Sequence, residues 1–131
     1  MSIIEVFNSI EKTKEYKKDG KLHSENDFPS VIGIYEESNP KKFLYKWHKN
    51  GILHRINGPA VIYKTDKCYS EEWWEEGKLH RNECGCSGTL HKNCGPAIIT
   101  ENKMCWFHKG KIHKNYGPAI IGFELGSKII E

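Results

Sequence analysis

The sequence predicts an all-β protein, an antiparallel meander of repeated β-hairpins that forms an open sheet or a short solenoid. Two repeated patterns in its 131 residues support this prediction. In the first pattern, an aromatic residue precedes a His by seven positions, and a Gly lies three positions before that His. The four copies run from Tyr16 to His23, from Trp47 to His54, from Trp73 to His80 and from Trp106 to His113. Because periods of roughly 20 to 50 residues mark repeat architectures, the chain is predicted to be an array of small units.

Each copy of the first pattern predicts a tight hairpin. Asn50-Gly51 and Asp19-Gly20 are typical of the two-residue type I′ turn, in which both residues have a positive φ. Glu76-Gly77 and Lys109-Gly110 keep the Gly at the second turn position. When these pairs form the loops, each aromatic residue lies opposite its His on one face of the hairpin. The Leu or Ile that precedes the His then lies on the other face.

The second pattern is Gly-Pro-Ala followed by two aliphatic residues, and it supplies the return strands. Its copies lie at residues 57–62, 94–99 and 116–121, and residues 27–32 are a divergent copy that reads Asp-Phe-Pro-Ser-Val-Ile. Because Pro lacks an amide donor, Gly-Pro is expected to bend the chain before the next strand. The match between residues 91–99 and 113–121 indicates a unit of 22 residues.

These patterns divide the chain into one repeat domain with two caps. Residues 1–14 are expected to form an N-terminal cap, residues 15–122 about four β-hairpin repeats, and residues 123–131 a C-terminal cap strand. A Cys-rich insertion near residues 81–94 interrupts the repeats. Exposed end strands of an open sheet invite pairing, so the apolar ends also predict a homodimer through one end of the array.

Composition narrows the classes of function. The chain has no stretch of 18 apolar residues and no basic start followed by an apolar run, so a cytoplasmic protein is expected. The net charge is +3, and only two of the 20 basic residues are Arg. Because guanine and phosphate are read by the forked guanidinium of Arg, sequence-specific binding of nucleic acid is not expected.

The stretch Asn-Gly-x-Leu-His-Arg-x-x-Gly-Pro-Ala at residues 50–60 resembles the degenerate MORN-type repeats that are abundant in giant DNA viruses and large phages. The resemblance covers roughly residues 15 to 122. It implies a MORN-like β-hairpin fold, a virus-encoded protein in the host cytoplasm, and a role in protein association. MORN repeats are sometimes described as attaching to membranes, but this chain has fewer glycines than such repeats, and a membrane partner is not expected.

The candidate binding residues are the aromatic residues and histidines of the first pattern: Tyr16, His23, Trp47, His54, Trp73, His80, Trp106 and His113. In one interpretation they line a face that holds an anion or a nucleotide base by stacking and charge. In the other, each His packs on its aromatic neighbour and hydrogen-bonds the backbone of the Gly-Pro bend. A residue that recurs in every unit favours the second interpretation, because catalysis needs different groups in different roles. No catalytic residues are therefore predicted, and the protein is not expected to be an enzyme.

A second candidate site is a metal site formed by Cys84, Cys86, His91 and Cys94. These four residues lie within 11 positions and offer the thiolate and imidazole donors that tetrahedral zinc prefers. The chain has five cysteines, an odd number, and reduced thiols or a structural zinc are expected rather than a disulfide framework. The alternative is that His91 is only a repeat position. Cys68 and Cys105 are expected to be small core residues on strands.

Together these observations predict a noncatalytic repeat module that binds another protein. The alternative is a small-ligand binder that sequesters a nucleotide or another anion on a face lined by His, Trp and Lys. No cofactor is expected apart from the structural zinc.

Overall fold

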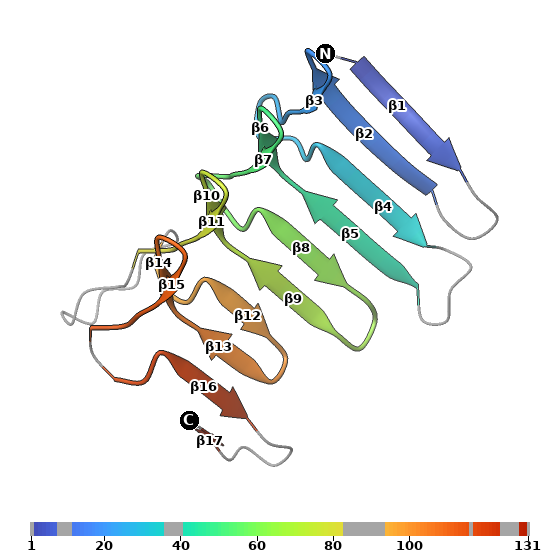
Figure 1. Ribbon diagram of the computed structural model, residues 1–131. Coiled ribbons are helices and arrows are strands. Elements are labelled where there is room, and N and C mark those ends of the chain that lie inside the picture. Colours follow the sequence, from blue (N-terminus) through green and yellow to red (C-terminus); the bar gives the residue numbers. More distant parts are fainter. Residues whose placement is uncertain are drawn as a thin grey trace.

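The computed structural model describes residues 2–7, 12–35, 41–82, 94–115, 117–123 and 129–130. All the secondary structure in this part of the chain is β, which confirms the predicted fold class. Eleven strands form one open antiparallel sheet, and the strands follow one another across the sheet in the order in which they occur in the chain (Figure 1). None of the described residues belongs to a helix that could cross a membrane.

The order of the strands across the sheet is a meander. It runs β1 (Ser2–Phe7), β2 (Lys12–Lys18), β4 (Val31–Tyr35), β5 (Lys42–Lys46), β8 (Val61–Lys64), β9 (Tyr69–Glu72), β12 (Ile98–Thr100), β13 (Lys103–Cys105), β16 (Ile120–Phe123) and β17 (Ile129–Ile130). The short strand β3 (Lys21–Leu22) pairs with the end of β2. Each unit therefore contributes one outgoing and one returning strand to the sheet.

Between the outgoing and the returning strand, the chain forms a small hairpin at the ends of these strands. The first hairpin is the end of β2 with β3, and the other three are β6 (His48–Lys49) with β7 (Ile52–Leu53), β10 (Trp74–Glu75) with β11 (Lys78–Leu79), and β14 (Phe107–His108) with β15 (Lys111–Ile112). The four hairpins follow one another in a row along one side of the sheet (Figure 1). We call this arrangement the hairpin row.

The predicted turns are present at all four positions. Both turn residues have a positive φ, for example 50° at Asn50 and 85° at Gly51, as a type I′ turn requires. The predicted register is also confirmed, because the backbone N–H of each His donates to the carbonyl of its aromatic partner. These distances are 3.0 Å for His23 to Tyr16, 3.1 Å for His54 to Trp47, 2.9 Å for His80 to Trp73 and 3.1 Å for His113 to Trp106.

The core lies where the hairpins join the sheet. Trp47 and Trp73 are only 6% and 7% exposed, and the small residues that end the Gly-Pro segments, Ala60 and Ala97, are fully buried. Ala60 connects two strands, since its carbonyl accepts the N–H of Trp47 and its own N–H donates to the carbonyl of Glu72, both at 2.8 Å. A larger side chain would have to enter this junction, which explains why a small residue recurs there.

Two expectations are wrong. The unit is longer than 22 residues, because each one holds two sheet strands as well as a hairpin. Successive aromatic positions are 31, 26 and 33 residues apart. Cys68 is not a core residue on a strand, because it is exposed in the turn before β9, where its N–H donates to Thr65 Oγ1 at 2.9 Å. Cys105 is buried on β13, as expected.

Candidate binding surface along the hairpin row

The same three hydrogen bonds recur between each hairpin and the next one. The Gly of each turn donates its N–H to the preceding hairpin, from Gly51 to Leu22, Gly77 to Leu53 and Gly110 to Leu79, at 2.8, 2.9 and 2.8 Å. In the other direction, the residue after each His donates to the next hairpin, from Ser24 to His48, Arg55 to Trp74 and Arg81 to Phe107, at 2.8, 3.1 and 3.3 Å. The third bond comes from the imidazole. The hairpins therefore form a second ladder beside the sheet.

The repeated His supplies the acceptor of that third bond. Nδ1 of His23, His54 and His80 accepts the N–H of the first turn residue in the following hairpin, which is Asn50, Glu76 and Lys109, at 3.2, 2.9 and 2.9 Å. Nδ1 serves as an acceptor at all three positions, so each imidazole links its own hairpin to the turn of the next one. The repeated His does hydrogen-bond the backbone, as the second interpretation expected. The bond goes to the next hairpin, however, and not to the Gly-Pro bend.

A basic residue covers the tryptophan ring of each of the last three aromatic–His pairs. The guanidinium of Arg55 lies 3.8 Å from the centre of the Trp47 ring, Arg81 lies 3.7 Å from Trp73, and the ammonium of Lys114 lies 4.0 Å from Trp106. These are cation–π distances. The sequence interpretation missed this role, although the position after the His is basic in these three units.

The first two hairpins enclose a hollow of about 320 Å³. Its lining residues are His23, Ser24, Asp27, Trp47, His48, Lys49, His54, Arg55, Ile56 and Asn57. Asp27 holds the guanidinium of Arg55 with two bonds, at 2.9 and 3.1 Å. Each member of this ion pair is followed by an exposed apolar residue, since Phe28 is 69% and Ile56 is 65% exposed.

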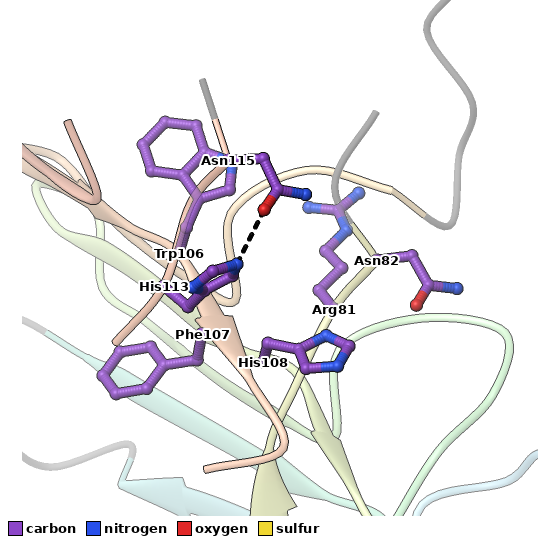
Figure 2. Close-up of a pocket in the computed structure, with 7 residues that line it drawn as sticks. All are labelled: Arg81, Asn82, Trp106, Phe107, His108, His113 and Asn115. Atoms are coloured by element: carbon purple, nitrogen blue, oxygen red, sulfur yellow. Dashed lines mark hydrogen bonds between the residues drawn. The ribbon is translucent and has the colours of Figure 1, made fainter. Parts of the chain in front are cut away.

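An equivalent hollow of about 410 Å³ lies between the third and fourth hairpins (Figure 2). Its lining residues are Arg81, Asn82, Trp106, Phe107, His108, His113 and Asn115, and none of them is acidic. Two imidazoles line it, those of His108 and His113, with ring centres 6.1 Å apart. The His108 ring also lies 4.8 Å from that of His80, which is outside the lining. Loss of hydration and the nearby positive groups of His80, Lys109 and His113 lower the pKa of His108.

The eight predicted binding residues do not form a single site. They lie as four aromatic–His pairs, one in each hairpin, and Trp47–His54 and Trp106–His113 each line one of the two hollows. The side chains of His54 and His80 are both 11% exposed, and that of His23 is 17% exposed. His113 is exposed, because no hairpin follows it in the row within the described part of the chain.

Three members of the predicted metal site, Cys84, Cys86 and His91, lie outside the described residues. The fourth, Cys94, is disulfide-bonded. A disulfide sulfur is not the thiolate that zinc binds. Within the described ranges, no three His, Cys, Asp or Glu side chains are arranged to hold a metal ion. Zinc in this set stays a prediction, and metal analysis of fully reduced protein tests it, with about one zinc per chain expected if the set binds.

No protein-family model matches this chain, and neither a curated protein nor a solved structure matches it significantly. The resemblance to MORN-type repeats therefore stays an expectation from the sequence.

Proposed function

We propose that the protein is a noncatalytic module that binds a partner protein through the first two hairpins. The proposal rests on one observation, the exposed pair Phe28 and Ile56 beside the hollow that contains Trp47. We expect the protein to be virus-encoded and to act in the cytoplasm of the host cell.

The chemistry of this surface is that of a protein interface. A few aromatic and aliphatic anchors supply most of the binding energy of such interfaces, and polar groups surround them. Phe28 and Ile56 are anchors of this kind, and the Asp27–Arg55 ion pair that joins their two loops holds them in place. No packing against the described residues explains side chains that are 69% and 65% exposed. A partner that covers them would remove this apolar surface from water.

The test compares capture of cellular proteins by the wild type and by the double variant Phe28→Asp/Ile56→Asp. We expect the variant to lose specific partners that the wild type retains, because two charges would enter a desolvated interface. Tyr69→Ser is the matched control, since Tyr69 is also exposed (39%) but lies on strand β9 of the sheet. Equal capture by all three proteins would refute the proposal.

A second candidate function is the binding of a small anion or a nucleotide in the hollow between the third and fourth hairpins. The absence of acidic residues among its lining residues supports this candidate. The hollow between the first two hairpins differs, because Asp27 neutralises Arg55 there. Imidazoles and the aromatic rings of Trp106 and Phe107 suit a phosphate and a base. The volume of about 410 Å³ falls in the range of small-molecule sites.

Calorimetric titration with ATP and with pyrophosphate tests this candidate. We expect His108→Ala to weaken binding roughly five-fold, because one hydrogen bond or charge contact is removed. Lys49→Ala is the control, since Lys49 holds the same position in the second hairpin. Both ligands are expected to remain intact after incubation with the protein. If neither ligand releases or absorbs heat on binding, the candidate fails.

A further inference from the structure

The fourth hairpin, β14–β15, carries on its outer face the same groups that join each of the other hairpins to its successor. In the three preceding hairpins, a Leu carbonyl and the His Nδ1 accept two consecutive N–H groups, and the next residue donates its N–H to a carbonyl. The equivalent groups here are the carbonyl of Ile112, Nδ1 of His113 and the N–H of Lys114. Among the described residues, no hydrogen bond reaches any of these three groups.

Exposure confirms that this face is open. Ile112 is 55% exposed, whereas Leu22, Leu53 and Leu79 are partly covered at the same position of their hairpins. His113 is exposed, and its Nε2 bonds Asn115 Oδ1 at 2.9 Å, which fixes the orientation of the ring (Figure 2). The face is therefore a preformed row of acceptor, acceptor and donor.

The three internal junctions show what such a row binds. In each of them the occupant is a two-residue turn with positive φ at both positions, which presents two consecutive N–H groups on the same side. A carbonyl two positions before the turn accepts the remaining N–H, as His48 does for Ser24 at 2.8 Å. This set of groups is specific to a type I′ hairpin, because ordinary turns have negative φ at their first central residue.

A second copy of this chain does not fit the face well. Its first turn, Asp19-Gly20, is open, since no described atom lies within 4 Å of the site a Gly20 Cβ would occupy. However, Lys17, which corresponds to the acceptor His48, is already paired with Ser2 of β1. Strand β1 thus occupies the place that the last hairpin of another copy would need.

We propose that the outer face of β14–β15 is a docking site for a type I′ hairpin of a partner protein, with Ile112, His113 and Lys114 as its contacts. This site is independent of the surface around Phe28 and Ile56. The docked hairpin would be the fifth in the row, held by the same bonds that join the first four, a form of β-augmentation at a hairpin rather than at a sheet edge.

The test uses a backbone-cyclised peptide with the sequence of residues 46–55, which contains the Asn50-Gly51 turn. Titrated into isotope-labelled protein, it is expected to shift the NMR signals of residues 112–114 saturably. His113→Ala should weaken binding about five-fold, because one hydrogen-bond acceptor is lost. A peptide with sarcosine in place of Gly51 lacks the N–H meant for the Ile112 carbonyl and should bind weakly too.

Lys103→Ala is the control, since Lys103 is exposed on the sheet strand β13 and outside the hairpin row, and it should leave peptide binding unchanged. Three results would overturn the proposal: no shifts at millimolar peptide, equal binding of the sarcosine peptide, or shifts that cluster on other strands. Shifts of residues 112–114 and 19–20 on raising the concentration of the protein alone would identify a second copy as the occupant. Loss of peptide binding in the variant Phe28→Asp/Ile56→Asp, by contrast, would show that the peptide needs the surface around Phe28 and Ile56, so that the two proposed sites are one.

Discussion

At the scale of single residues, the first two units differ from the others by a matched pair of substitutions. Ser30 stands where the next two units have the buried residues Ala60 and Ala97, and His48 stands where the third and fourth hairpins have Trp74 and Phe107. Ser30 Oγ lies 2.7 Å from His48 Nδ1 and donates to the carbonyl of Lys46 at 3.1 Å. Because both buried polar groups are satisfied, the pair can replace an apolar contact without a large loss of stability.

The burial of His48 predicts a pH dependence of folding. Loss of hydration and, second, the charge of Lys46 lower the pKa of His48 from its ordinary value of 6.5. The unfolded chain therefore takes up this proton first as the pH falls, so the contribution of His48 is complete above pH 6.5 and is lost below it. Urea unfolding from pH 7.5 to 5 should show a smaller slope in His48→Phe, by at most about 1.4 kcal/mol per pH unit. Identical slopes in the two proteins would contradict the prediction.

The Gly of the Gly-Pro segment in the second unit leaves room for the guanidinium of Arg55. A Cβ on Gly58 would lie 2.8 Å from Nη1 and 2.9 Å from Cζ of Arg55. The divergent first unit lacks both residues, with Ser24 after its His and Phe28 before its Pro. Gly58→Ala should therefore cost about 1–3 kcal/mol in the free energy of unfolding in the wild type. In an Arg55→Ser background the same substitution should cost less than half as much, measured in a double-mutant cycle. Additive effects would show that the guanidinium is not the obstacle.

At the scale of elements, the sequence predicted the hairpins better than their contacts. Turn pairs such as Asn50-Gly51 act locally, so the type I′ geometry and the pairing of Trp47 with His54 followed from the spacing alone. The bond from the Glu76 N–H to His54 Nδ1 joins two units and connects residues that lie 22 positions apart in the chain. The sequence holds no local signal for such a contact, because it depends on the distance between neighbouring hairpins in the folded sheet. The rest of the lining of the two hollows, beyond the predicted aromatic–His pairs, was missed for the same reason.

The turns also differ in how well their first residue suits a positive φ. Asn50 has a φ of 50° and Lys109 a φ of 49°, but Asn adopts this region more readily than Lys. Lys109→Asn should stabilise the protein by about 0.5–1 kcal/mol. The reverse change in the second hairpin, Asn50→Lys, should destabilise it by a similar amount. Urea midpoints check both, and a stabilising Asn50→Lys would rule out this explanation.

At the scale of the whole molecule, the protein is a one-dimensional stack whose two ends differ. Strand β1 continues the sheet past the first hairpin, and β16 and β17 continue it past the fourth (Figure 1). The sheet thus extends beyond the hairpin row at both ends. The predicted homodimer through one end would use β1 or β17, since each pairs with one strand only among the described residues. Sedimentation velocity at high concentration checks it, and a single monomeric species would contradict it.

The stack predicts that one substitution has different effects along the row. His54→Ala leaves the N–H of Glu76 without its acceptor at a junction between two hairpins, and it should cost about 1–3 kcal/mol in the free energy of unfolding. His113→Ala removes an imidazole whose Nδ1 has no acceptor role in the described chain, and it should cost less than about 0.5 kcal/mol. Hydrogen exchange adds a second measurement, because the amide of Glu76 should lose protection in His54→Ala while the amides within β6 and β7 keep theirs. If both variants lose equal stability, the His is needed inside its own hairpin, and the ladder between hairpins does not hold the array together.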